Sequence, residues 1–97
     1  MSRQYELRYT LEFDRDLDGI PPYDGPIIRT AVLVLGHQAE QPTRNRRPLM
    51  RPVSWCSDAT WQLRIGQYRV LYSVHERKVS LLRVTLKGRG TTEEMGR

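Results

Sequence analysis

The segments WQLRIGQYRVLYSV (residues 61–74) and VSLLRVTLKGR (residues 79–89) decide the fold, because apolar and polar residues alternate along most of both. Alternation with a period of two is typical of strands that are buried on one side. Gly66-Gln67 and the stretch 75–78 have the composition and spacing of hairpin turns. The sequence therefore predicts three consecutive antiparallel strands, the last of which ends at Lys87-Gly88-Arg89.

The same alternation assigns side chains to the two faces of the predicted sheet. The apolar residues of the first strand share one face, and Gln62 and Arg64 share the other. In the second strand, Arg69 points away from the face that carries Tyr68 and Val70. If the hairpin register pairs Arg64 with Arg69, both lie on one surface that the apolar core does not need.

The first half of the chain predicts a strand and two helices. Residues 5–9 alternate as a half-buried strand does, and Thr10 can cap a helix that runs through Asp18. Residues 27–41 have helical spacing but are β-branched enough to form a buried strand. We expect a helix, because the segment is about 15 residues long and is bounded by prolines. Strand pairing within it would contradict the predicted fold.

The predicted order is β-α-α-β-β-β, an α+β fold with an antiparallel sheet and two helices packed on one face. A chain of 97 residues is long enough for one modest core, so we expect a single domain over residues 1–97. The other face of the sheet is expected to be uncovered and to present the two arginines.

Residues 42–60 have neither period and are rich in proline and arginine, so they are expected to form the longest loop. Its basic side chains form either a phosphate-binding arm or a solvated loop. Trp55 and Trp61 are expected to anchor the core or the loop rather than to stack on bases. The candidate arm consists of Arg44, Arg46, Arg47 and Arg51.

Charge is segregated along the chain. Residues 1–40 carry four basic and seven acidic side chains, a net charge of −3, whereas residues 41–97 carry twelve and four, a net charge of +8. Fourteen of the sixteen cations are arginine, whose planar fork suits phosphate, although genome base composition also favours arginine. The second half is therefore the expected site of any contact with a polyanion.

Several function classes find no support in the sequence. Cys56 is the single cysteine and has no partner for a disulfide or a metal site, and His37 is expected to face solvent. We expect no metal and no cofactor. No run of 18 apolar residues occurs and the amino terminus lacks an apolar signal, so we expect a cytoplasmic protein without a membrane span.

Several blocks of the sequence resemble the RelE/ParE superfamily of toxins from type II toxin–antitoxin pairs. They are the stretch 5–10 running into Asp16-Leu17, the run Arg47-Pro48-Leu49, the block LRIGQYRVLY (residues 63–72) and the terminal Arg83-Val84. The resemblance covers about residues 5–95 and implies a compact toxin that a cognate antitoxin wraps. RelE-like members are ribosome-dependent nucleases that cut messenger RNA without a metal, and ParE-like members inhibit DNA gyrase.

The resemblance also implies candidate site residues. By position, Arg69, Arg64 and one of Lys87 or Arg89 correspond to the cations that orient the scissile phosphate while the ribose 2′-hydroxyl attacks. Two positions depart from the RelE pattern: Gln62 stands where a first cation is expected, and no tyrosine follows Tyr72. Three functions remain open: a RelE-like endoribonuclease, a ParE-like gyrase inhibitor, and a basic module that only binds an acidic antitoxin. Arg69 could also be structural, paired with Asp58 or Glu76.

Overall fold

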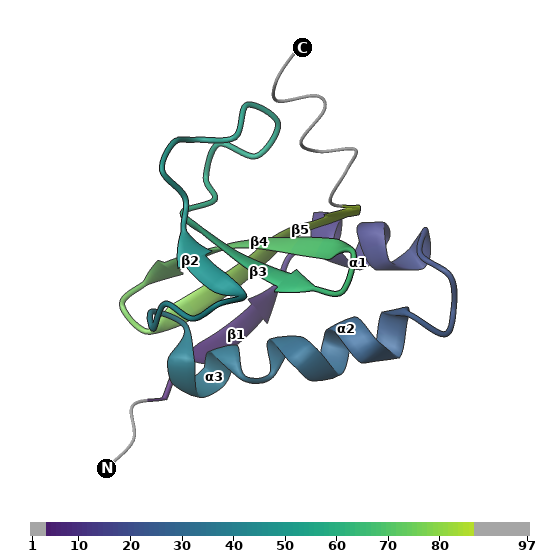
Figure 1. The fold of residues 1–97 in the computed structure, drawn as a ribbon, viewed down its shortest axis with the longest axis horizontal. Coiled ribbons are helices and arrows are strands. Elements are labelled where there is room, and N and C mark those ends of the chain that lie inside the picture. The colour runs from purple at the N-terminus through teal and green to yellow at the C-terminus, as the bar shows by residue number, and fades with distance from the viewer. Residues whose placement is uncertain (1–3, 87–97) are drawn as a thin grey trace.

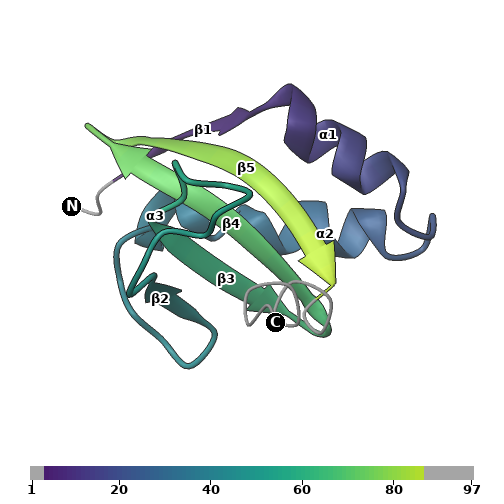
Figure 2. The ribbon, with the colours of Figure 1, turned by 90° about the horizontal axis from the view of Figure 1, so that it is seen from above.

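A computed structural model describes residues 4–86, and it has the predicted α+β fold. The sheet has the strand order β1-β5-β4-β3-β2, and α2 and α3 lie along one of its faces (Figures 1 and 2). The elements are β1 (Glu6–Tyr9), α1 (Leu11–Asp18), α2 (Gly25–Val32), α3 (Leu35–Gln38), β2 (Arg46–Pro48), β3 (Trp61–Ile65), β4 (Tyr68–His75) and β5 (Lys78–Leu86).

Thr10 ends β1 and starts α1, as its sequence position predicts. Its hydroxyl oxygen accepts a hydrogen bond from the backbone N–H of Phe13 at 3.1 Å, which satisfies one of the unpaired amides of the first turn. The same hydroxyl donates to the carbonyl of Leu81 at 2.8 Å. One side chain therefore caps the helix and ties its start to β5, while Phe13 and Leu17 turn into the core.

The segment 27–41 is helical rather than extended, but it forms two helices instead of one. At Leu33-Val34 the backbone bonds shift to the i→i−3 pattern of a 3₁₀ turn, for example from the N–H of Leu33 to the carbonyl of Thr30 at 3.2 Å. The buried stripe continues across this turn because its residues keep a spacing of four, three and four. It consists of Ile28, Val32, Leu35 and Ala39.

The strands β3, β4 and β5 are antiparallel, as predicted, and two tight turns join them. Gly66 has φ +60°, a conformation that glycine adopts without a steric cost. The second turn places Glu76 (φ 51°) and Arg77 (φ 69°) in the left-handed region, as a type I′ turn requires. The sheet is antiparallel, as predicted, except at one edge, where β1 runs parallel to β5.

The strand β2 lies within the segment that was predicted to be a loop. It has three residues and pairs with β3 at the outer edge of the sheet, where Pro48 is tolerated because its missing N–H faces no further strand. It is too short to show a period in the sequence. Within residues 4–86, no helix is long and apolar enough to cross a membrane.

Candidate functional site

Arg64 and Arg69 are direct cross-strand partners on the sheet face away from α2 and α3. The two-residue turn makes Ile65 and Tyr68 the hydrogen-bonded pair, so the next pair along the hairpin is the non-hydrogen-bonded one. The N–H of Arg64 accordingly donates outward, to the carbonyl of Asn45 at 2.7 Å. Partners of this kind have Cα atoms only about 4.5 Å apart, so the two guanidinium groups can reach one anion. The hairpin register therefore meets the condition under which Arg64 and Arg69 lie on one surface.

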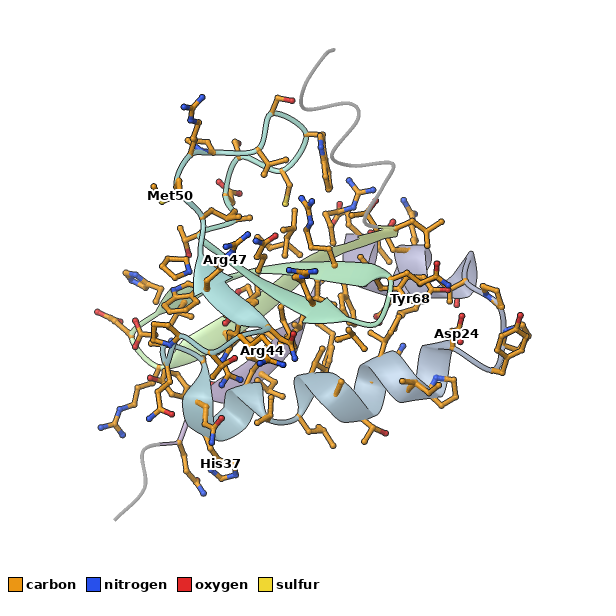
Figure 3. All side chains as sticks on the ribbon, in the orientation of Figure 1. Asp24, His37, Arg44, Arg47, Met50 and Tyr68 are labelled. Carbon is orange, nitrogen blue, oxygen red and sulfur yellow. The ribbon has the colours of Figure 1, made fainter. Side chains whose placement is uncertain are left out.

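Two further arginines share this face. Arg47 pairs with Gln62 and Arg83 pairs with Leu71, which places one arginine on each of the four adjacent strands β2 to β5. In Figure 3, Arg47 lies on the opposite side of the sheet from the helices, while His37 projects from α3. We call this set the arginine face: Arg47, Arg64, Arg69 and Arg83.

The four arginines of the predicted arm differ in their exposure to solvent. Arg44 and Arg51 are exposed in the segments that flank β2, and Arg47 is exposed on β2 itself. Arg46, in contrast, is only 3% exposed. Its guanidinium donates to the backbone carbonyl of Gln41 and to the side-chain oxygen of Gln38, both at 2.9 Å. This side chain therefore fastens the link between α3 and β2 instead of facing solvent.

The prediction that this sheet face is uncovered is wrong for the part of the face around Leu71 and Leu82. Residues 49–60 fold back over it on the side opposite α2 and α3 (Figure 1). Val53 and Ala59 are buried against Leu71, and Leu82 packs against the same cluster. A β-bulge interrupts the pairing of β4 with β5 at this place, because the register passes from Leu71–Arg83 to Tyr72–Leu81. Leu82 therefore has no partner in β4, and its side chain packs against the loop cluster.

Asp16 of α1 holds the end of β5 and the guanidinium of Arg83. Its carboxylate accepts hydrogen bonds from Arg83 Nε at 2.8 Å, from Arg83 Nη2 at 3.2 Å and from the backbone N–H of Val84 at 2.8 Å. The register of β1 with β5 stops at Leu81, so the carboxylate takes the place of a neighbouring strand at Val84. The hydrogen bond to Asp16 raises the pKa of Arg83, which keeps this side chain charged.

A cleft of about 500 Å³ opens beside this anchor, between the end of α1, the 49–60 loop and the outer edge of β5. The guanidinium carbon of Arg83 lies 5.5 Å from the centre of the Trp55 ring, a distance typical of a cation–π contact. The lining residues include Arg15, Asp16, Ile20, Trp55, Arg83 and Thr85.

Two other ionisable groups near the site have shifted pKa values. Tyr68 donates to Asp24 at 2.6 Å, and this hydrogen bond raises the pKa of Tyr68 to about 12 (Figure 3). Burial raises the pKa of the Cys56 thiol, which disfavours the reactive thiolate. In the described part of the chain, no three histidine, cysteine or acidic side chains are grouped as metal ligands.

Lys87 and Arg89 lie outside the described residues. Gln62 is buried between Arg47 and Leu71, so the position where a first cation was expected contributes no charge to the face. Sequence reasoning missed Arg83 as a member of the site. Arg83 and Thr85 alternate with Val84 and Leu86, and this alternation could have placed Arg83 on the sheet face opposite the core.

Comparisons with known proteins give structural matches only; no family model and no curated protein matches the chain. The RelE–RelB complex of Pyrococcus horikoshii OT3 matches with a TM-score of 0.68 and 19% identity over 89% of this chain and 98% of that chain. The RelBE2 toxin–antitoxin complex of Mycobacterium tuberculosis matches with a TM-score of 0.58 and 30% identity, covering 87% and 92%. A chromosomal ParDE system from P. aeruginosa matches with a TM-score of 0.59 and 18% identity, covering 86% and 96%.

The fold and its basic face thus define a small α+β domain of the kind found in toxin–antitoxin complexes. The 30% identity with a chain of the RelBE2 complex extends over nearly the whole of both chains. The chain belongs to the RelE/ParE superfamily of toxins.

Proposed function

We propose that the chain is a RelE-like toxin of a type II toxin–antitoxin pair, which cuts messenger RNA on the ribosome in the cytoplasm. The observation that carries this proposal is the direct pairing of Arg64 with Arg69 on the sheet face away from the helices. Two planar forks on one anion provide bidentate hydrogen bonds, and their charge stabilises the phosphorane-like transition state. In this step the 2′-oxygen loses its proton and bonds to phosphorus, while the bond from phosphorus to the 5′-oxygen breaks and that oxygen leaves as a hydroxyl, so the products are a 2′,3′-cyclic phosphate and a 5′-hydroxyl end. Arg47 extends the same positive surface to β2, whereas Arg83 on β5 is paired with Asp16.

In this proposal Arg64 and Arg69 orient the scissile phosphate, and Arg47, Arg44 and Arg51 guide the RNA strand. Lys87 and Arg89 remain candidates for the cation that follows the last strand. Arg46 has no part in RNA binding, because its guanidinium is buried and hydrogen-bonded to Gln38 and Gln41.

An acidic antitoxin is the proposed protein partner. Two of the similar structures are complexes of RelE with RelB, and the +8 charge of residues 41–97 favours an anionic partner. Electrostatic attraction of this kind speeds association and is screened by salt. Co-expression of the acidic protein encoded beside the toxin should therefore relieve growth inhibition.

Primer extension on a messenger RNA in a translating extract tests the proposed activity. We expect cleavage at codon boundaries only when ribosomes are present. Hydrogen bonds to a charged phosphate are worth about 1.5–3 kcal/mol, so Arg69→Ala should cut the cleavage rate by roughly 10- to 150-fold. Arg8→Ala is the matched control, because Arg8 is half exposed on β1 and paired with Glu6.

Three results would contradict the proposal. If the RNA stays intact while gyrase-linked DNA breaks accumulate, the protein is a ParE-like inhibitor. If neither activity is seen and the antitoxin still binds, the protein is a basic binding module. If Arg69→Ala unfolds the domain in a thermal melt, the role of Arg69 is structural.

A further inference from the structure

The cleft beside β5 combines features that suit a flat, electron-rich ring. One wall is the Trp55 indole with the guanidinium of Arg83 over it, and Ile20 and Val84 supply apolar surface. Single-stranded nucleic acids are held by the stacking of unpaired bases on aromatic rings and on arginine planes. The volume of about 500 Å³ is within the range of sites that hold small molecules, and it can accept one base with its ribose.

Trp55 packs against the cluster of Val53, Ala59 and Leu71, but it leaves one polar atom unpaired there. Its indole N–H is buried, and no hydrogen-bond partner for it exists among residues 4–86. Buried donors in native proteins are almost always paired, so an unpaired donor calls for an explanation. The contact with Arg83 and the adjacent cleft are the features of this position that a base-binding role would use.

The cleft is also within reach of the paired arginines. Thr85 lines the cleft and is the cross-strand partner of Arg69, one strand spacing of about 5 Å away. A nucleotide whose phosphate lies on Arg64 and Arg69 therefore has its neighbour at the mouth of the cleft. Arg15, exposed at the rim, adds a second positive charge there, while Asp16 is already bonded to Arg83 and Val84.

We propose that this cleft binds one unpaired base of the RNA segment whose phosphate lies on Arg64 and Arg69, with the base stacked on the Trp55–Arg83 pair. This inference rests on the proposed function and adds a base-binding subsite to it. It assigns Trp55 a role in substrate binding, whereas the sequence favours an anchoring role.

Nuclear magnetic resonance of the ¹⁵N-labelled full chain, made in a cell-free reaction, tests the proposal directly. The chain has two tryptophans, so its spectrum has two indole N–H signals, and Trp55→Phe identifies which is which. Trp61 is an internal reference, because it stacks on Tyr72 on the helix side of the sheet. The probes are a 2′-O-methyl RNA trinucleotide, which cannot be cut by its own 2′-hydroxyl, and an abasic trinucleotide with the same phosphates.

The base-bearing probe should shift the Trp55 signal and leave the Trp61 signal in place, and the abasic probe should shift neither. Stacking contributes about 1–3 kcal/mol per base, so Trp55→Leu should weaken binding of the base-bearing probe by about 5- to 150-fold. Binding of the abasic probe should not change. Met50→Ala is the matched control, since Met50 is 96% exposed in the same loop and does not line the cleft.

The proposal is overturned if both probes bind equally well and the Trp55 signal does not move. It is also overturned if neither probe binds at low salt, because stacking needs no ribosome. The spectra of the unaltered protein give this answer even if Trp55→Leu fails to fold. Ribosome-dependent cleavage is measured separately, so in either case the proposed function can stand while the subsite is rejected.

Discussion

Replacing Asp16 with alanine should destabilise the domain far more than replacing its neighbour Asp14 on the same helix. The Asp16 carboxylate is 19% exposed and accepts two hydrogen bonds from Arg83 and one from the Val84 amide. Asp14 is 45% exposed and meets Arg29 at 3.2 Å in an ion pair open to solvent. The two variants remove the same charge from α1 but different contacts.

The expected cost follows from these contacts. A hydrogen bond from an amide to a carboxylate is worth about 1.5 kcal/mol or more. The Arg83 side chain is 35% exposed, so solvent screening limits the ion pair with Asp16 to about 1 kcal/mol. Asp16→Ala should therefore lower the free energy of unfolding by about 2–3 kcal/mol, or the melting temperature by roughly 10–20 °C for a domain of this size.

Urea and thermal unfolding, followed by circular dichroism, measure both variants. Asp14→Ala should cost less than about 1 kcal/mol, as exposed ion pairs do. Asp16→Asn should fall between them, because its amide oxygen can still accept from Val84 but the charge is lost. Equal destabilisation by Asp16→Ala and Asp14→Ala would refute the view that Asp16 anchors the end of β5.

Two further predictions concern side chains on the helix side of the sheet. Arg46→Ala should cost about 1.5–3 kcal/mol in urea unfolding, because it removes a buried side chain whose charged guanidinium donates two hydrogen bonds at 2.9 Å, whereas Arg44→Ala should be nearly neutral. Equal effects would mean that the buried contacts of Arg46 add nothing. The hydrogen bond to Asp24 favours the neutral phenol of Tyr68, so its contribution to stability is complete below pH 10 and is lost between pH 10 and 12. The stability difference between the unaltered protein and Tyr68→Phe should therefore disappear over that interval, and a constant difference would contradict the assignment.

The sequence predicts the hairpins and the helices well, because their signals are local. Alternation over 61–74 fixes which face each side chain takes, and the two-residue turn at Gly66-Gln67 then fixes the pairing of Arg64 with Arg69. Thr10 predicts the start of α1, because its hydroxyl oxygen can accept a hydrogen bond from an amide of the first turn. The 3₁₀ turn that divides the second helix leaves no such signal, because the apolar spacing continues through it.

Arg46 is buried and Arg47 is exposed, and the sequence could not predict this difference. Both belong to a basic segment without a period, and a strand of three residues is too short to reveal alternation. The register with β3 decides the outcome: Arg46 lies opposite Leu63 and turns toward α3, and Arg47 lies opposite Gln62 and turns away from it. A shift by one residue would exchange the two roles. The bulge at Leu82 and the cover formed by the 49–60 loop depend in the same way on contacts between distant residues.

The topology separates in space the acidic and basic residues that are separated along the chain. The helices come from the acidic first half and cover one face, whereas β2 to β5, which bear the arginine face, come from the basic second half. The two halves meet where Asp16 binds Arg83, so α1 neutralises the arginine that stacks on Trp55 and holds it in place. Arg64 and Arg69 lie on the inner strands β3 and β4, on the face that turns away from α2 and α3. The site proposed for the substrate phosphate therefore lies on strands that the basic second half of the chain supplies, and the anchored Arg83 lies at its border on β5.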